Sequence, residues 1–186
     1  MIKKLFITLT CIVTCMFTCA VSVQACSLDE YNKLAKETSG VCQVFKTTCT
    51  IKLVEHPKMW AQTKAYGAIE ISTELVDKMN EAQVRGVLYH EAGHAVLQHV
   101  EKSAEYLYIT KRMGTYNETL YHNMRRQYEL QADRFAVFTG ILINKDTDLA
   151  GALKILTPLD QYYTTHSSHP STMERIERIR RIYYGQ

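Results

Sequence analysis

The chain has 186 residues, with 22 basic and 19 acidic side chains and a formal net charge of +3. Removing Lys3 and Lys4, which open an N-terminal apolar run, lowers this charge to +1, so the rest of the chain is nearly balanced. A balanced chain lacks the basic surface that nucleic-acid binding requires, and no nucleic-acid partner is expected. The lack of internal repeats excludes a repeat array.

Residues 1–25 have the pattern of a signal peptide. A basic start is followed by an uncharged apolar run, and Val23-Gln24-Ala25 is an A-x-A-like cleavage site. Cleavage there predicts an exported chain of residues 26–186, which is long enough for a single domain with its own core. The alternative is an uncleaved anchor helix, since the apolar run approaches the length that spans a membrane.

Export would leave three of the six cysteines in the mature chain, Cys26, Cys42 and Cys49. An odd number in an exported protein indicates that one of them has a separate role. The sequence Val23-Gln24-Ala25-Cys26 resembles a bacterial lipobox, in which the cysteine is lipidated and becomes the first residue. The alternative is ordinary signal cleavage, after which Cys26 follows the cleavage site without a lipid. Lipidation of Cys26 would leave Cys42 and Cys49 as a pair, and a disulfide between them is expected because reduced thiols are unusual after export.

The first half of the mature chain predicts a mixture of short elements. Ser27-Leu28-Asp29-Glu30 is a capping box that would open a helix to about Ser39, with Gly40 ending it. Alternating β-branched residues predict a hairpin over residues 41–54, whose two strands the disulfide would bridge. Residues 60–71 are expected to form an extended strand and residues 72–79 a short helix.

The motif His90-Glu91-Ala92-Gly93-His94 contains residues that can bind a metal and catalyse hydrolysis. A capping box at Asn80 and Gln83 and an apolar stripe predict that it lies on a helix. Residues four apart share one helical face, so His90 and His94 can bind one zinc ion. Glu91 can then face a metal-bound water and take its proton as the hydroxide attacks a peptide carbonyl.

A hydrolytic zinc site needs a third protein ligand and one open position. The segment Tyr128-Glu129-Leu130-Gln131-Ala132-Asp133 also has a helical pattern, with Gly140 as a plausible stop. Glu129 could enter the zinc shell, while Asp133 accepts the outward N–H of a ligating imidazole. The alternative is an exposed acidic pair on a solvated helix.

These two segments resemble the gluzincin metalloendopeptidases of the family that includes the CAAX prenyl endopeptidases and bacterial HtpX, and within it the small LoiP-type lipoprotein peptidases. The likeness runs from about Trp60 to Arg178. It implies an α+β, mostly α fold, with a small antiparallel sheet or hairpin beside the active-site helix. It also implies one zinc ion per chain and the following site residues: His90, His94 and Glu129 as ligands, Glu91 as general base, and Asp133 orienting His90.

The resemblance also implies how substrate is held. The strand near Trp60 would be an edge that binds an extended peptide by strand addition, although Lys58-Met59 stand where the family usually has Asn-Ala. His169-Pro170 would lie on a loop near the zinc face. There His169 could donate to the tetrahedral oxyanion or act as a reversible fourth ligand, the alternative being a surface histidine.

The remaining elements are expected to be helical. His99 would lie about 140° round the helix from His94 and is interpreted as a packing or surface histidine. Residues 103–126 predict a helix, a turn at Gly114 and a second helix, with tyrosines that pack. Residues 146–157 predict an amphipathic helix. In the last helix, opened by Ser171, three arginines are expected on a solvated face: Arg175, Arg178 and Arg181.

Together these patterns predict a zinc-dependent endopeptidase of the bacterial cell envelope that cleaves extended or misfolded envelope proteins. It would be exported and anchored to the outer membrane through lipidated Cys26. The alternative is a zinc-binding periplasmic assembly factor with little proteolysis. A structural zinc site is disfavoured, because closed structural sites usually have four protein ligands.

Overall fold

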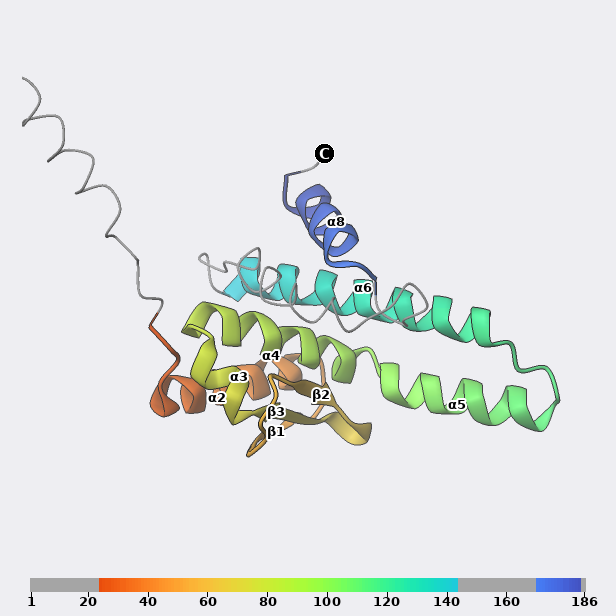
Figure 1. Ribbon diagram of the computed structural model, residues 1–186, viewed down its shortest axis with the longest axis horizontal. Helices are drawn as coiled ribbons and strands as arrows, with labels where there is room; N and C mark the ends of the chain where they lie inside the picture. Colours follow the sequence, from red (N-terminus) through yellow and green to blue (C-terminus); the bar gives the residue numbers. More distant parts are fainter. Residues whose placement is uncertain (1–23, 144–169, 185–186) are drawn as a thin grey trace, which may run out of the picture.

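A computed structural model describes residues 24–143 and 170–184, and Figure 1 shows the arrangement of their elements. The fold is α+β and mostly helical, as predicted. In chain order the elements are α2 (Leu28–Val44), β1 (Thr50–Val54), β2 (Ala61–Thr63), η1 (Ala65–Gly67), β3 (Ala68–Ser72), α3 (Thr73–Lys78), α4 (Glu81–Val96), α5 (His99–Arg112), α6 (Glu118–Ile143) and α8 (Thr172–Tyr184).

The first helix is longer than the sequence pattern indicated. The predicted capping box at Ser27 and Glu30 opens α2, but the helix continues through Gly40 to Val44, with Phe45 as its C-cap. A Cβ at Gly40 would meet nothing, so this glycine creates no packing requirement. Burial of Val41 and Cys42 continues the apolar face of α2 and outweighs the cost of a helical glycine, which is about 1 kcal/mol.

The predicted hairpin over residues 41–54 is therefore wrong, although the predicted disulfide is present. Cys42 lies on α2, and its Cα is 5.9 Å from the Cα of Cys49, just before β1. The bond links a helix to a strand instead of two strands of a hairpin. Both cysteines are buried in the main core cluster.

The predicted strand over residues 60–71 is divided into β2 and β3 by the short helix η1. Tyr66 and Gly67 in this turn have φ of 61° and 72°. A Cβ at Gly67 would overlap the carbonyl of Thr48, so the turn requires glycine there. The sheet has the order β1-β3-β2, with β1 parallel and β2 antiparallel to β3, so it is mixed where an antiparallel one was expected.

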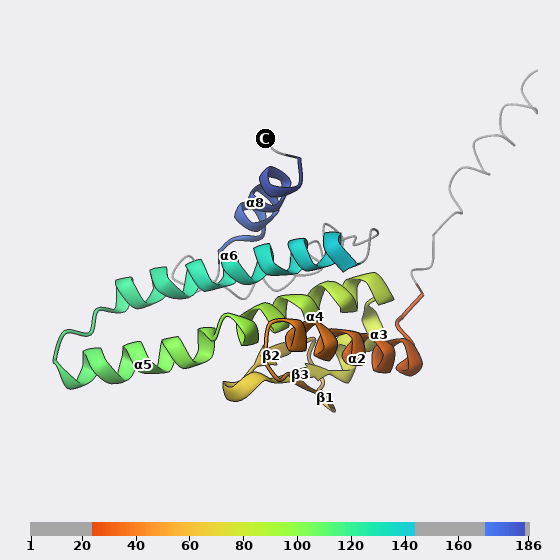
Figure 2. The same ribbon diagram turned by 180° about the vertical axis from the view of Figure 1, so that it is seen from behind.

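Helix α4 lies at the centre of the molecule, between the sheet and α2 on one side and α6 on the other (Figures 1 and 2). The predicted capping box at Asn80 and Gln83 opens it. Its side chains are buried on most faces, which explains its largely apolar sequence: Val84, Val87, Leu88, Tyr89, Ala92 and Ala95. A helix packed on several sides holds its polar residues in fixed positions.

The crossing of α4 and α6 is close because Gly93 lies at the contact. A Cβ on Gly93 would be 3.0 Å from Ala132 Cα and 3.1 Å from Phe135 Cβ, both on α6. Such separations are shorter than ordinary van der Waals contact. The absence of a side chain at Gly93 therefore brings α6 within reach of the histidines of α4.

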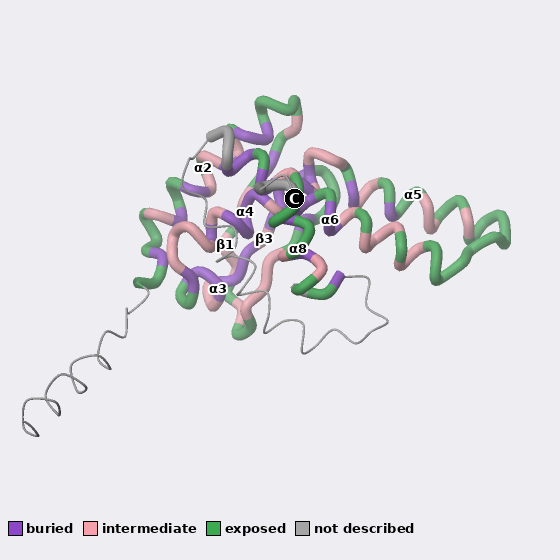
Figure 3. The backbone as a smooth tube through the Cα atoms, turned by 90° about the horizontal axis from the view of Figure 1, so that it is seen from above, coloured by how far each residue is buried: buried purple, intermediate pink, exposed green. Residues whose placement is uncertain are grey.

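The helices α5 and α6 form a hairpin that extends away from the body of the molecule (Figure 3). They are joined by a turn at Gly114, whose φ is +69°, which confirms the predicted helix-turn-helix. Helix α6 continues through Gly140, so the predicted stop there is wrong. Within the described residues, no helix has both the length and the apolar character to cross a membrane.

The last helix, α8, packs against α6 (Figure 1). The hydroxyl of Ser171 accepts a hydrogen bond from the backbone N–H of Glu174, as its predicted capping role requires. The predicted helix over residues 146–157 lies outside the described residues.

Candidate metal centre

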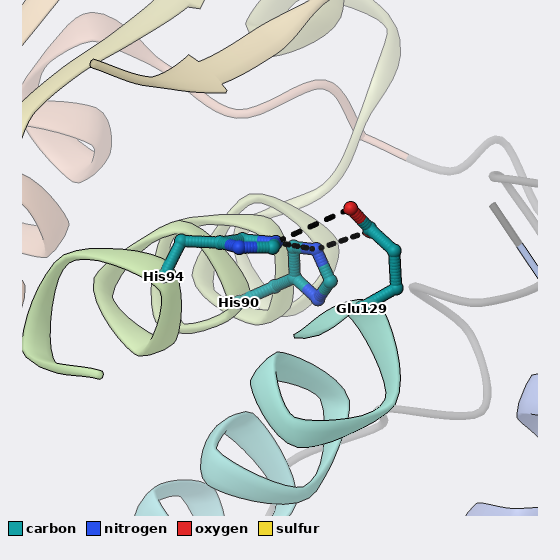
Figure 4. A group of neighbouring side chains, drawn as sticks. All are labelled: His90, His94 and Glu129. Carbon is teal, nitrogen blue, oxygen red and sulfur yellow. Dashed lines mark hydrogen bonds and ion pairs between the residues drawn. The ribbon is translucent and has the colours of Figure 1, made fainter. Parts of the chain in front are cut away.

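Two helices bring three potential metal ligands together. His90 and His94 lie one turn apart on α4, and Glu129 approaches from α6 (Figure 4). The Nε2 atoms of the two imidazoles are 3.1 Å apart. Glu129 Oε2 lies 3.4 Å from His90 Nε2, and Glu129 Oε1 lies 3.7 Å from His94 Nε2.

These separations fit a single zinc ion. With metal–ligand bonds of about 2.0–2.1 Å in tetrahedral geometry, neighbouring donor atoms are about 3.3 Å apart. The donor set of two imidazoles and one carboxylate is typical of hydrolytic zinc sites, which keep one position open. The structure thus assembles the predicted ligands His90, His94 and Glu129, and no other described residues form such a group.

His90 is oriented by a buried ion pair behind it. Its Nδ1 lies 2.9 Å from Asp133 Oδ1, as predicted. Arg175 of α8 donates from Nε to Asp133 Oδ2 at 2.8 Å and from Nη2 to Oδ1 at 2.6 Å. The predicted solvated position of Arg175 is wrong, since this side chain is buried while Arg178 and Arg181 are exposed.

The charges in this network stabilise one another. Burial alone would raise the pKa of Asp133, but the charge and hydrogen bonds of Arg175 outweigh it and lower that pKa to about 2. Burial opposes a proton on His90, yet the carboxylates of Asp133 and Glu129 raise its pKa to about 10 in the metal-free protein. A metal ion must therefore displace a proton from His90 when it binds.

His94 has its own outer partner, His99, which the sequence pattern placed wrongly. Helix α4 ends at Val96, and Gln98 adopts φ 57°, so a new helix begins at His99 and the His99 side chain lies against His94. The Nδ1 atoms of His94 and His99 are 3.0 Å apart, and His99 Nε2 is 3.0 Å from Gln131 Oε1. The ring of His99 also stacks on Tyr128 at 4.3 Å.

The hydrogens of this chain have one consistent arrangement. When His94 Nε2 faces a metal, its Nδ1 carries the proton and donates to His99 Nδ1. His99 then carries its own proton on Nε2 and donates to Gln131. Burial and the charge of His94 lower the pKa of His99 to about 4, which keeps it neutral as this arrangement requires.

Glu91 lies beside the ligands and is only 8% exposed. The hydroxyl of Thr63, on strand β2, lies 2.7 Å from both Glu91 Oε2 and the Glu91 carbonyl oxygen. A hydroxyl has one proton, so it donates to one of these acceptors at a time. Thr63 thereby ties the edge strand to the predicted base, a contact across 28 residues that the sequence did not indicate.

The site opens into a cleft of about 540 Å³. Strand β2, helix α4 and the two helices of the projecting hairpin all contribute to its walls. Its lining residues are Trp60, Ala61, Gln62, Thr63, His90, Glu91, His94, His99, Val100, Ser103, Ala104, Leu107, Tyr121, Arg125, Tyr128 and Glu129. Glu91 and the three candidate ligands therefore line a space that can admit a substrate.

Cys26, the predicted lipidation site, is not among the lining residues of the cleft. His169 is outside the described residues, so its suggested catalytic role stays a prediction. Cys26 is buried, and its backbone N–H donates to the carbonyl of Met79 at 2.7 Å. Burial raises the pKa of its thiol to about 11, with smaller contributions from Glu30 and Glu81.

Two comparisons with known proteins indicate the family of this chain. The model of Peptidase family M48 matches residues 31–122 and 107–183. The chain is also similar to a protein of Escherichia coli (strain K12) named Metalloprotease YcaL, with 29% identity over 180 residues, or 83% of this chain and 69% of that protein. The matched family ranges include the three candidate ligands, Glu91 and Arg175.

Proposed function

The chain belongs to peptidase family M48 and is a metallopeptidase, and from that premise we propose that it is a zinc-dependent endopeptidase of the bacterial cell envelope. The observation that carries the proposal is the convergence of two imidazole nitrogens and a carboxylate beside a buried glutamate. Zinc fits the separation and chemistry of these donors better than magnesium or calcium, which prefer oxygen ligands.

The metal ligands, Glu91 and Thr63 have different roles in the proposed reaction. Zinc held by His90, His94 and Glu129 would supply Lewis-acid activation of a water and of the scissile carbonyl. Glu91 accepts the proton of the attacking water and delivers it to the leaving amine. Thr63 holds the Glu91 carboxylate toward the cleft, because its hydroxyl can donate to Oε2.

Strand β2 offers a backbone edge for an extended substrate. Trp60 and Lys64 use their backbone groups to pair with β3, at Ser72 and Ala68. In an antiparallel pair the direction of backbone groups alternates, so those of Ala61 and Thr63 point away from β3. Both residues line the cleft, and a peptide could add to this edge with little dependence on its side chains.

The cellular setting follows from the N-terminal segment. A signal peptide ending at Ala25 and a lipid on Cys26 would place the enzyme in the periplasm, on the outer membrane, where extended or misfolded envelope proteins are substrates. The buried thiol of Cys26 would have to turn outward to carry a lipid. Labelled palmitate should enter the wild type and not Cys26→Ser, and a free thiol on the mature chain would contradict the lipid anchor.

The enzymatic proposal is tested by replacing the base while keeping the metal. Protein expressed from the full chain should contain about one zinc ion and digest casein. Glu91→Gln should keep the zinc and lose activity by about 10²- to 10⁴-fold, the usual contribution of general-base catalysis. Glu105→Gln, an exposed change on α5, is the matched control and should keep full activity.

Two results would contradict the proposal in different ways. Equal activity in the wild type and Glu91→Gln would show that Glu91 is not the base. Zinc binding without activity in either protein would favour the assembly-factor alternative, in which the cleft captures extended clients without cleaving them.

A further inference from the structure

The end of the cleft away from the metal ligands has a chemistry of its own. Its walls come from the hairpin, with Val100, Ala104 and Leu107 on α5 facing Tyr121 and Arg125 on α6. These side chains are apolar or aromatic apart from one guanidinium. The reaction assigned above uses none of them.

Arg125 differs from the neighbouring arginines of α6, because its guanidinium has no ion-pair partner among residues 24–143 and 170–184. Arg126 forms an ion pair with Glu174, and the guanidinium of Arg134 lies over the ring of Phe138 at 5.4 Å. Within the described part of the chain, no carboxylate lies within ion-pairing distance of Arg125, which is half-buried in the cleft wall. A cation in such a position is available to an anion that enters the cleft.

The position of Arg125 relative to the metal ligands is set by helical spacing. Tyr121, Arg125 and Glu129 are four residues apart, so they share one face of α6, about 6 Å from one to the next along the axis. An extended peptide advances about 3.3 Å per residue. Arg125 is thus within reach of a side chain one or two residues from the bond held at the metal.

The opposite wall suits the stem of an acidic side chain. Val100, Ala104 and Leu107 can contact methylene groups, while the guanidinium of Arg125 binds a terminal carboxylate through two parallel hydrogen bonds. A basic side chain would be repelled at the same position. The two carboxylates that line the cleft, Glu91 and Glu129, lie at the metal end and leave this end positive.

We infer that the hairpin end of the cleft is a subsite for a substrate carboxylate, with Arg125 as its specificity-determining residue. The carboxylate belongs either to an acidic side chain beside the scissile bond or to the free C-terminus of a peptide. This inference rests on the proposed peptidase function, and it identifies the class of substrate that the function selects.

The experiment uses peptides that share one cleavable bond and carry Glu, Gln or Lys on either side of it. Each peptide is made with a free and with an amidated C-terminus, so that the two sources of carboxylate are separated. Hydrolysis is measured as kcat/KM with the wild type. Binding is measured by fluorescence anisotropy in the zinc-loaded Glu91→Gln protein, which gives a readout that does not require turnover.

The variants are Arg125→Gln, Arg125→Glu and the matched control Arg134→Gln, an arginine of the same helix outside the cleft lining. The wild type should prefer a carboxylate by about tenfold or more over the neutral or basic counterpart, as expected for a charge-assisted hydrogen bond. Arg125→Gln should abolish this preference and Arg125→Glu should reverse it. Arg134→Gln should keep it.

Each outcome decides one question. If amidation of the peptide C-terminus removes the preference, the ligand of the subsite is the C-terminal carboxylate. If the preference depends only on Glu beside the scissile bond, the ligand is the side-chain carboxylate. Both results support the subsite. An unchanged preference in Arg125→Gln, or none in the wild type, overturns it. Failure of the peptidase proposal would look different, because no peptide would be cleaved while the charge preference in binding could still be measured.

Discussion

The two ends of the cleft are built in opposite ways. At the metal end, the ligating histidines and the base have outer partners in buried networks through Asp133, His99 and Thr63. At the hairpin end, the contacts are stacked rings such as Tyr106 and Tyr121, whose centroids are 6.0 Å apart. Beside them lies Arg125, which pairs with no carboxylate of the described residues. The chemistry is thus fixed by the core, and selectivity is left to a more exposed surface.

This difference has a physical basis in packing. Helix α4 is covered by α2, the sheet and α6, so a change there must displace several neighbours. The outer part of the hairpin exposes large apolar side chains, including Tyr108, Ile109 and Met113. Substitutions at exposed positions usually change stability by less than about 0.5 kcal/mol. The outer part of the hairpin can therefore vary in sequence without disturbing the metal site.

Arg175→Met is expected to have the largest effect on the metal end of the cleft. This change leaves the buried carboxylate of Asp133 without its bidentate partner, which typically costs about 3–5 kcal/mol. We expect a large drop in the free energy of unfolding, measured by urea denaturation. Arg178→Met, an exposed change on the same helix, should have little effect. Equal stability of the two variants would show that the ion pair does not hold the metal end together.

His99→Leu should weaken metal binding although it leaves all three metal ligands in place. It removes the acceptor of the His94 Nδ1 hydrogen, and loss of such a partner typically lowers metal affinity by about 10- to 100-fold. Competition with a zinc chelator measures the affinity. His122→Leu, on the hairpin and half-exposed, serves as the control. An unchanged affinity would mean that the contact between the two imidazoles is one of packing only.

Asp133 makes the stability of the metal end sensitive to acid. Its pKa is about 2 when folded, below the value of 3.8 for an unperturbed carboxyl, so the ionised form stabilises the fold. This contribution, about 2 kcal/mol, is present above pH ~4 and is lost as the pH falls toward ~2. Urea denaturation across this range should show a steeper loss in the metal-free wild type than in Asp133→Asn. Parallel curves would contradict the assignment.

Thr63→Val tests the link between the edge strand and the base at nearly constant volume. Loss of the hydroxyl removes the hydrogen bond that orients Glu91, and we expect kcat to fall about tenfold with KM and zinc content unchanged. Thr63→Ser restores the donor and should recover most of the activity. A fall in both variants would indicate a packing role for the threonine methyl group.

The smallest effect is expected at the tip of the hairpin. Tyr108 is 63% exposed, and Arg112 donates a hydrogen bond to its hydroxyl at the surface. Tyr108→Ser should shift the free energy of unfolding by less than about 0.5 kcal/mol and leave zinc affinity unchanged. A loss comparable to that of Arg175→Met would show that the hairpin belongs to the same cooperative unit as the core, and the proposed division would fail.

The sequence by itself determined the parts of this protein that depend on local spacing. Helical periodicity places His90 and His94 on one face, and the same rule places Glu129 and Asp133 one turn apart on α6. The side-chain caps at Ser27 and Asn80 were also predictable, because each involves a residue only three positions away. Such contacts are made by any chain that adopts the local conformation.

Only the tertiary structure decided which distant residues complete the site. Arg175 reaches Asp133 across 42 residues, and Gln131 reaches His99 across 32. The glycines at positions 40 and 140 also did not end their helices as their local preference predicted, since α2 and α6 continue through them. In α2 the local cost of a helical glycine, about 1 kcal/mol, is smaller than the gain from burying Val41 and Cys42 on the same apolar face. Long-range packing, which no local pattern encodes, therefore selected the partners that hold the metal ligands in place.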